Sequence, residues 1–277
     1  MKEKLGIDIY SELFLDVNDD QDKTNELIFT QNFILDFIQN NNFKELRNKK
    51  YDYRFINYGD TELVFVIKTE EGKYYTMLIN QPSTKKELVK DEYYNLSKLS
   101  KTNNFVIKPL YYFEKDDKSL YITPYVYQAR CIASSSKGFG AYVPEPVYHF
   151  REFDEEERKI INKVMVANIV KLYNEKESLG LSDIKFGGGD FILEKEYDNE
   201  SKTIDNTLKR MKLIAARSQI KISFEDYLNL LRKELVMRTY YSNKKYRDKN
   251  VLLNLKSRAP MTKEEVEEGI ALGLKIR

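Results

Sequence analysis

The chain has 277 residues, of which 42% are hydrophobic and 32% charged, a composition that indicates a globular protein with a sizeable core. Its 46 basic and 44 acidic residues leave a formal net charge of +2, which excludes a whole-protein electrostatic attraction to nucleic acid or to a membrane surface. The single cysteine, Cys131, excludes an internal disulfide and a cysteine-based zinc site, and the single histidine, His149, excludes a multi-histidine metal site.

Nothing in the pattern indicates secretion or membrane insertion. Residues 1–10, MKEKLGIDIY, lack the apolar region of a signal peptide. No stretch approaches the ~20 apolar residues that a membrane span requires. We therefore expect a cytoplasmic protein that does not associate with a membrane.

Residues 1–50 are expected to form an extension before the main sheet. Phe29, Phe33 and Phe37 recur at helical spacing, and this spacing predicts an amphipathic helix over Phe29–Asn40. The apolar stripe of such a helix needs a surface to cover, so we expect it to pack on the body of the protein.

Residues 51–127 are predicted to form a small antiparallel sheet. Five segments rich in Val, Ile, Tyr, Phe and Thr fit a pleated, half-buried surface, and Gly or Asp residues stand where the chain must reverse. One helix, over Thr84–Lys101, interrupts the sheet after its third strand and must pack on one of its faces. The five predicted strands are Tyr51–Tyr58, Glu62–Thr69, Lys73–Asn80, Phe105–Phe113 and Ser119–Tyr127.

The helix over Thr84–Lys101 begins with a hydroxyl cap and carries an apolar face. Leu88, Leu96 and Leu99 lie on neighbouring turns of this face. Glu92 lies at its edge, and from the helical pattern alone it is interpreted as a carboxylate at the rim of the core.

Residues 128–277 are expected to form a mainly helical lobe. Its first segment, Gln128–Phe153, contains serines, glycines and prolines that forbid a long regular element, so we expect a connector or a lid there. The stretch SSSKGFG lacks the spacing of a phosphate-binding loop. His149 is expected to pack within the same segment.

The clearest helix of the chain, DEEERKIINKVMVANIVKLYNEKESLG, has acidic residues in its first turn and ends at a glycine. A loop follows, and then two predicted strands, FILEK and KTID. Three carboxylates stand at the ends of these elements: Asp183 and Asp190 in the loop, and Asp205 at the end of the second strand. A divalent metal or a proton-transfer site requires such loop carboxylates, and ordinary turns also contain them, so both interpretations stay open.

From Leu208 onward the pattern predicts helices over LKRMKLIAARSQI, SFEDYLNLLRKELVMRTYY and MTKEEVEEGIALGLKIR. Thr262 is placed to cap the last helix, with Glu265 in the capping-box position. The segment Lys209–Arg258 is basic and interleaved with tyrosines. A solvated helix face is the favoured interpretation of this segment, and contact with RNA or DNA phosphates is the alternative.

This order of elements resembles the protein-kinase-like fold, and most closely its smaller aminoglycoside-phosphotransferase branch. NYGDTELVFVIKTEEGKYYTMLI resembles the first three strands of the small lobe of that family, and EYYNLSKLSKTNNFVIKPLYYF resembles its helix C and fourth strand. The resemblance covers Tyr51–Asp205 and rests on order and spacing. It implies an α+β fold in two lobes, a small antiparallel-sheet lobe with one helix followed by a mainly helical lobe.

In the small lobe, the resemblance assigns three positions a role in holding a nucleotide. Gly59 marks the glycine-rich loop. Glu92 matches the helix-C glutamate that orients a phosphate-binding lysine. Tyr125 begins a segment, extending to Tyr127, that matches the hinge against the adenine ring.

In the second lobe, the resemblance assigns roles to the three carboxylates. Asp183 matches the catalytic-loop aspartate that positions the acceptor hydroxyl, and Asp190 falls near the metal-binding asparagine of that loop. Asp205 matches the aspartate that holds magnesium on the nucleotide phosphates. ATP and magnesium are therefore the cofactors that the resemblance implies, since phosphoryl transfer needs positioning and charge neutralisation.

The chain also departs from the family pattern. The third-strand lysine, expected near Leu78, is missing. Lys68 on the second strand could reach the phosphates in its place, as in kinases that resemble the with-no-lysine group, if its side chain faces the cleft. The sequence Leu181-Ser182-Asp183 replaces a histidine-containing tripeptide, and three glycines lengthen the loop before Asp190.

Three functional hypotheses follow. The missing lysine favours a degenerate, pseudokinase-like protein that binds nucleotide or serves as a scaffold for a protein partner. The retained acids favour an ATP-dependent phosphotransferase with full or residual activity. A nucleic-acid-associated protein of phage or plasmid origin, which would use the basic segment Lys209–Arg258, is the third hypothesis.

Overall fold

The computed structural model describes residues 21–58, 62–81, 84–131, 155–175, 178–179, 181, 184–185, 191–218, 223, 225–226, 228–229 and 262–276. Contacts divide the chain into two compact units. Unit 1 comprises Met1–Tyr94, Lys108–Tyr125 and Gly138–Val147, and unit 2 comprises Asn95–Ile107, Val126–Lys137 and Tyr148–Arg277. The predicted division of the chain at residues 50 and 127 stays a prediction.

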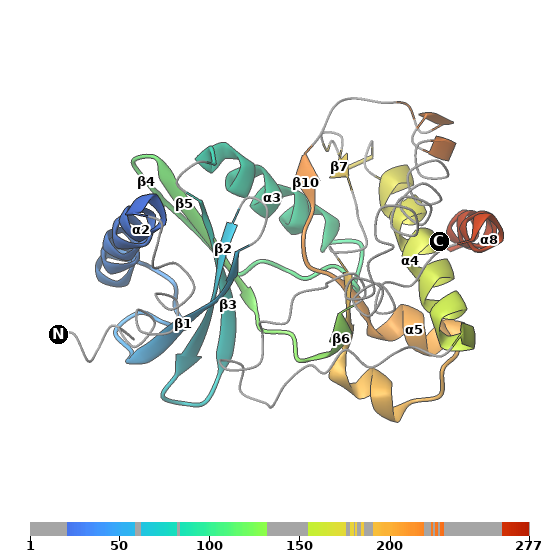
Figure 1. Ribbon diagram of the computed structural model, residues 1–277, viewed down its shortest axis with the longest axis horizontal. Helices are drawn as coiled ribbons and strands as arrows, with labels where there is room; N and C mark the ends of the chain where they lie inside the picture. Colours follow the sequence, from blue (N-terminus) through green and yellow to red (C-terminus); the bar gives the residue numbers. More distant parts are fainter. Residues whose placement is uncertain are drawn as a thin grey trace. The chain divides into compact units, whose positions relative to one another are not determined.

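Unit 1 is built on a five-stranded antiparallel sheet with a helix against each face, which confirms the predicted α+β class (Figure 1). The strand order is β1-β2-β3-β5-β4, so β3 and β5 are neighbours although a helix and β4 separate them in sequence. Both β1 and β2 have the bounds that the sequence predicted. The elements are α2 (Gln21–Asn40), β1 (Tyr51–Tyr58), β2 (Glu62–Thr69), β3 (Tyr74–Asn80), α3 (Lys86–Leu99), β4 (Tyr111–Lys115) and β5 (Lys118–Pro124).

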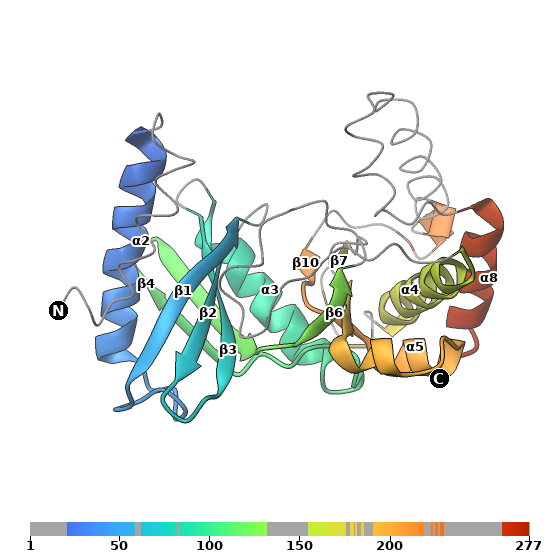
Figure 2. The same ribbon diagram turned by 60° about the horizontal axis from the view of Figure 1, so that its bottom comes forward.

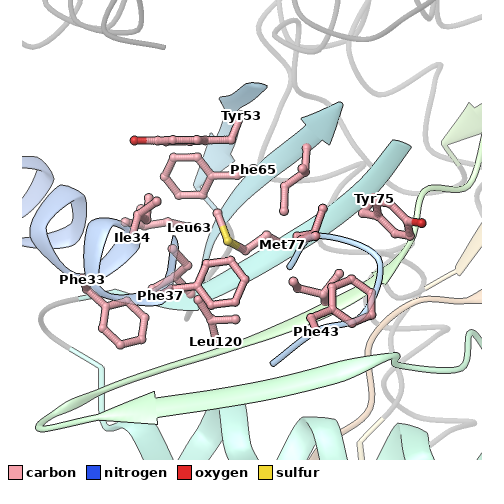
Figure 3. Packing of buried hydrophobic residues seen from close by; sticks show 14 residues of the cluster. Phe33, Ile34, Phe37, Phe43, Tyr53, Leu63, Phe65, Tyr75, Met77 and Leu120 are labelled. Atoms are coloured by element: carbon pink, nitrogen blue, oxygen red, sulfur yellow. The ribbon is translucent and has the colours of Figure 1, made fainter. Parts of the chain in front are cut away.

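The core of unit 1 lies between α2 and one face of the sheet, termed the outer face (Figure 3). The helix predicted over Phe29–Asn40 is confirmed and extends back to Gln21. Alternate strand residues supply the other half of the core, as the two-residue period of a strand requires. The buried cluster consists of Phe33, Ile34, Phe37, Phe43, Leu46, Tyr53, Leu63, Phe65, Ile67, Tyr75, Met77, Ile79, Leu120 and Ile122.

The first part of α3 packs on the opposite face of the sheet, termed the inner face. The ring centroid of Tyr93 lies 5.1 Å from that of Tyr112 on β4 and 6.4 Å from that of Tyr121 on β5. Val89 is fully buried, whereas Leu88 is 41% exposed, so the predicted apolar face of this helix is rotated by one residue at its start.

The fourth strand begins at Tyr111 rather than at Phe105. Phe105, Val106 and Ile107 belong to unit 2, where they are buried, and Val106 forms a parallel bridge with Leu213. One apolar run therefore serves two units, a division that β-propensity along the run does not reveal.

Unit 2 contains two small antiparallel sheets, with strand orders β6-β8-β9 and β10-β7, together with several helices in its described part. Among the helices that the structure describes, none combines the length and apolar composition that a membrane crossing needs. The elements are β6 (Gln128–Cys131), α4 (Glu155–Glu175), β7 (Ile184–Lys185), β8 (Phe191–Glu194), the 3-10 helix η3 (Lys195–Asn199), α5 (Ile204–Arg210), β9 (Met211–Leu213), β10 (Arg217–Ser218) and α8 (Lys263–Gly273).

The helix pair α4 and α8 lies side by side in unit 2 (Figure 2). Both helices were predicted, and so was the capping box of α8. The hydroxyl of Thr262 accepts from the Glu265 backbone, and the Glu265 carboxylate accepts from the Thr262 backbone. The same carboxylate accepts a buried 2.7 Å hydrogen bond from the side chain of Asn162 on α4.

Two predicted elements of unit 2 are wrong. The strand predicted over KTID is the start of α5, because Thr203 caps that helix with a hydrogen bond to the backbone of Asn206. The helix predicted over LKRMKLIAARSQI ends at Arg210, and β9 and β10 follow it. Met211 and Leu213 are fully buried as strand residues paired with β8, so tertiary pairing overrides the helix propensity of the segment.

Candidate functional site

The inner face of the sheet in unit 1 is where the resemblance would place a nucleotide base. Its residues alternate with those of the outer-face core. Most are apolar or hydroxylated, and the polar residues Glu62 and Asn80 are buried at the end of the strands opposite the exposed Lys68. Val64, Thr76 and Leu78 are half-buried, so this face is not sealed as the outer face is. The residues of the inner face on β2, β3 and β5 are Glu62, Val64, Val66, Lys68, Tyr74, Thr76, Leu78, Asn80, Ser119, Tyr121 and Thr123.

Tyr125, the predicted hinge residue, directly follows β5. Its backbone N–H donates to the carbonyl of Tyr74 at 3.3 Å, and the two rings lie 6.2 Å apart. The end of β5 is therefore anchored to the beginning of β3. Tyr125 stands at the same end of the inner face as Tyr74, and its assignment to an adenine site stays a prediction.

Lys68 also stands at this end of the sheet. It is exposed, it pairs in register with Tyr74, and its Nζ lies 5.7 Å from the centroid of the Tyr74 ring. Gly59 precedes β2 in the sequence, and β2 begins at Glu62, six residues before Lys68. At ~3.3 Å per residue, Glu62 and Lys68 are about 20 Å apart along the strand.

The position of Lys68 corrects its predicted role. A glycine-rich loop covers the phosphates of a nucleotide in kinases, whereas Lys68 lies beside Tyr74 at the opposite end of the strand, toward Tyr125. We therefore no longer assign Lys68 to the phosphates. Gly59 itself lies outside the described residues.

Glu92 is 1% exposed, so its interpretation as a rim carboxylate is wrong. It lies on the buried face of α3 between Val89 and Leu96, both fully buried. The sequence of β3, YYTMLIN, contains no lysine, and Leu78 occupies the position where one was expected. Glu92 is thus a buried carboxylate of α3, and β3 contains no lysine that it could orient.

Two of the three predicted carboxylates, Asp183 and Asp190, lie outside the described residues. The third, Asp205, is exposed in the first turn of α5, after the cap residue Thr203, and does not stand at the end of a strand. The helix dipole explains an acidic residue at this place without any ligand. The reason for assigning Asp205 to magnesium was its position at a strand end, and that position is wrong.

The strand β8 pairs with β6, which precedes it in the chain, and with β9, which follows it. The resemblance expects the metal-holding aspartate at the end of the strand that follows, and that strand is β9. Leu213, the last residue of β9, pairs with Phe191, the first residue of β8. After Leu213 the chain continues as Ile214, Ala215 and Ala216, without a carboxylate. Sequence reasoning missed this strand, although the apolar run MKLIAA after Arg210 is a signal typical of a short buried strand.

Two contacts within unit 2 hold the segment after β9 in place. The side chain of Asn95 on α3 donates to the carbonyl of Ala216 at 2.9 Å, and this hydrogen bond is buried. The next strand, β10, pairs with β7, which directly follows Asp183 in sequence. The segment between β9 and β10 therefore lies beside the strand that leaves the predicted catalytic loop.

The described beginning of the basic segment is neutralised by ion pairs. Arg210 contacts Glu200 at 2.5 Å and Glu194 at 3.3 Å, and Lys212 lies 3.8 Å from Glu194. The hydrogen bond from Arg210 holds the pKa of the Glu200 carboxyl below its ordinary value. These cations therefore pair with acids on and next to the three-stranded sheet β6-β8-β9. The remainder of the segment, beyond residue 218, lies almost entirely outside the described residues.

Within the described ranges, no group of three or more His, Cys, Asp or Glu side chains is arranged so that it could hold a metal ion. The acids next to the small sheet of unit 2, Glu194 and Glu200, instead face Arg210.

No family model and no curated protein matches the chain. Among solved structures, it is similar to the autoinhibited serine kinase domain of the giant muscle protein titin, with a TM-score of 0.38 and 16% identity, over 65% of this chain and 49% of that one. It is also similar to a twitchin kinase fragment from C. elegans, with a TM-score of 0.37 and 14% identity, over 60% of this chain and 32% of that one. The chain thus spans about half and about a third of these two structures. Likenesses at this level establish no shared activity.

Proposed function

We propose that this chain is a kinase-like protein that binds an adenine nucleotide, has lost phosphoryl transfer, and acts as a scaffold for a protein partner. The observation that carries the proposal is the end of β9, where Ile214, Ala215 and Ala216 follow the strand paired with β8. This is the place at which a kinase-like active site needs a metal-holding carboxylate.

The loss on β3 points in the same direction. Phosphoryl transfer is catalysed by positioning and by charges that neutralise the phosphates in the transition state. Leu78 takes the place of the β3 lysine, and Lys68 lies at the opposite end of the sheet from the glycine turn. Two of the charged groups that the reaction needs are therefore missing from their places.

The inner face of the sheet retains what binding of a base requires. Val64 and Leu78 are half-buried apolar side chains on adjacent strands, where they are direct register partners, and Thr76 lies next along the same face. Tyr74 and Tyr125 close one end of this surface with their rings 6.2 Å apart. Small-molecule sites are lined mainly by hydrophobic and aromatic side chains, so these residues suit a purine ring.

Two measurements on the full chain test this function. Titration calorimetry with ATP is expected to show binding, and an ATP turnover assay is expected to show no rate above the protein-free blank. Thr76→Tyr, which fills the inner face, is expected to abolish the binding. The matched control Lys73→Tyr places the same ring on a lysine that is 63% exposed, three residues away, and should leave binding unchanged. Absence of ATP binding, binding that survives Thr76→Tyr, or clear turnover would each contradict the proposal.

A further inference from the structure

The end of β9 has a consequence for how the nucleotide of the proposed function is held. Magnesium in nucleotide sites is bound by one or two carboxylates together with the phosphates and water, because it demands hard oxygen ligands. The side chains of Ile214, Ala215 and Ala216 contain no oxygen. The residues at this position therefore do not fit a magnesium ion.

The register between β8 and β9 locates the residues that lack a magnesium ligand. Leu213 lies opposite Phe191, so the residue that follows β9 leaves the sheet at the same edge at which the chain enters β8. The chain has alanine at 215 and 216, and Asn95 fixes the backbone there through its 2.9 Å bond to the Ala216 carbonyl.

No described acid nearby substitutes for the missing one. Asp205 is exposed on α5, with the rest of that helix and all of β9 between it and the end of the strand. Glu194 on β8 is engaged by Arg210 and Lys212, and Glu200 is engaged by Arg210 and Lys209. These carboxylates neutralise protein cations, so they are not available as metal ligands.

We infer that this protein binds its adenine nucleotide without magnesium, as a metal-free nucleotide recognised chiefly through its base. The inference rests on the proposed function, since it concerns the same nucleotide. It changes the identity of the ligand: metal-free ATP takes the place of the magnesium complex that a phosphotransferase uses.

The test is a titration of the full chain with ATP, once in excess magnesium chloride and once in excess EDTA. The expected result is an affinity that differs by less than about threefold between the two conditions. Binding that appears only with magnesium would overturn the inference while leaving the proposed function intact. Absence of binding in both conditions would overturn the proposed function and the inference with it.

A restoring variant sharpens the test. Ala215 is half-buried, so Ala215→Asp can be accommodated at the end of β9, whereas Ala216 is fully buried. Ala215→Asp is expected to make ATP binding at least about tenfold tighter in magnesium than in EDTA. Ala215→Asn has nearly the same size without the charge and should show no such dependence. Equal affinities of Ala215→Asp in magnesium and in EDTA, with an unchanged circular dichroism spectrum, would contradict the assignment of this position.

Discussion

Aromatic side chains fill the core of unit 1, whereas the helix pair of unit 2 is joined through its smallest residues. Phe37 on α2 is fully buried, with its ring centroid 5.6 Å from that of Phe113 and 6.2 Å from that of Tyr111. In unit 2, a Cβ added at Gly269 on α8 would stand 2.6 Å from the Cβ of Val166 on α4, closer than real Cβ atoms approach. The core of unit 1 is filled by large side chains, whereas the contact between α4 and α8 requires residues without a side chain.

This difference teaches that the two units fail in opposite ways. Truncating a large buried ring removes transfer free energy and leaves a cavity, so unit 1 is harmed by lost atoms. Helices in near-backbone contact leave no space for another carbon, so α4 and α8 are harmed by added atoms. Removing side-chain atoms is therefore expected to destabilise unit 1, and adding them is expected to destabilise the helix pair of unit 2.

The largest effect is expected from Phe37→Ala in unit 1. Loss of the buried ring should lower the free energy of unfolding by about 3–5 kcal/mol, measured by urea unfolding followed by circular dichroism. Leu88→Ala is the matched control, because that side chain is 41% exposed and its truncation should change the same quantity by less than about 0.5 kcal/mol. Equal effects of the two variants would contradict the claim that buried rings stabilise unit 1.

Gly269→Ala tests the other side of the comparison. In an open helix this change stabilises by about 1 kcal/mol. On α8, the added Cβ would meet Val166 and would lie 2.9 Å from the carbonyl of Lys163, so a net loss of about 1–3 kcal/mol is expected. Ala271 on the exposed side of α8 is the control, because Ala271→Gly should be destabilising there. A more stable Gly269→Ala protein would show that the helices are not closely packed.

Glu265→Ala removes the polar link between the same two helices. The carboxylate accepts from Asn162 at 2.7 Å and from the backbone of Thr262 at 3.2 Å, and its loss leaves both donors buried or uncapped. A decrease of about 1–2 kcal/mol in the free energy of unfolding is expected. Glu264→Ala, which truncates an exposed neighbour in the same helical turn, should have a much smaller effect. If both variants lose the same stability, Glu265 acts only as a helix-forming residue.

The smallest effect is expected at the surface of the small sheet in unit 2, where charge acts in place of packing. Arg210 lowers the pKa of Glu200 in the folded chain, so the pair stabilises the protein above the ordinary carboxyl value of 4.5, and this contribution is lost as the pH falls through the lowered value. Glu200→Gln should therefore flatten the acid side of a plot of melting temperature against pH. Glu196→Gln, at an exposed position of η3, is the control and should leave the plot unchanged. An identical acid profile in Glu200→Gln and the unaltered chain would exclude a stabilising role for the pair.

The sheet of unit 1 could largely be predicted from the sequence because its pairings are local. Three residues separate β1 from β2 and a short turn joins β2 to β3, so alternation and turn-forming residue types together determined bounds and order. The capping box of α8 is local as well, since Thr262 and Glu265 stand three residues apart. Interactions between residues that are near in sequence can be predicted from the local sequence pattern.

The candidate site was only partly predictable, because its decisive features join distant segments. Neither the burial of Glu92 nor the place of Lys68 relative to the glycine turn follows from one segment, since each depends on the face and register that the assembled sheet provides. Composition showed that β3 lacks a lysine, but only the register showed that Lys68 stands at the wrong end to replace it.

The sequence by itself determined the α+β class and the helix that follows the third strand. Tertiary structure decided which later strand pairs with β8, and thereby moved the strand end from Asp205 to Leu213. The physical reason is that η3 and α5 separate β8 from β9, so the pairing of Phe191 with Leu213 is selected by burial of Met211 and Leu213 and not by a turn signal. Local propensity favoured a helix through Met211–Leu213, and the free energy of burying these side chains against β8 outweighed it.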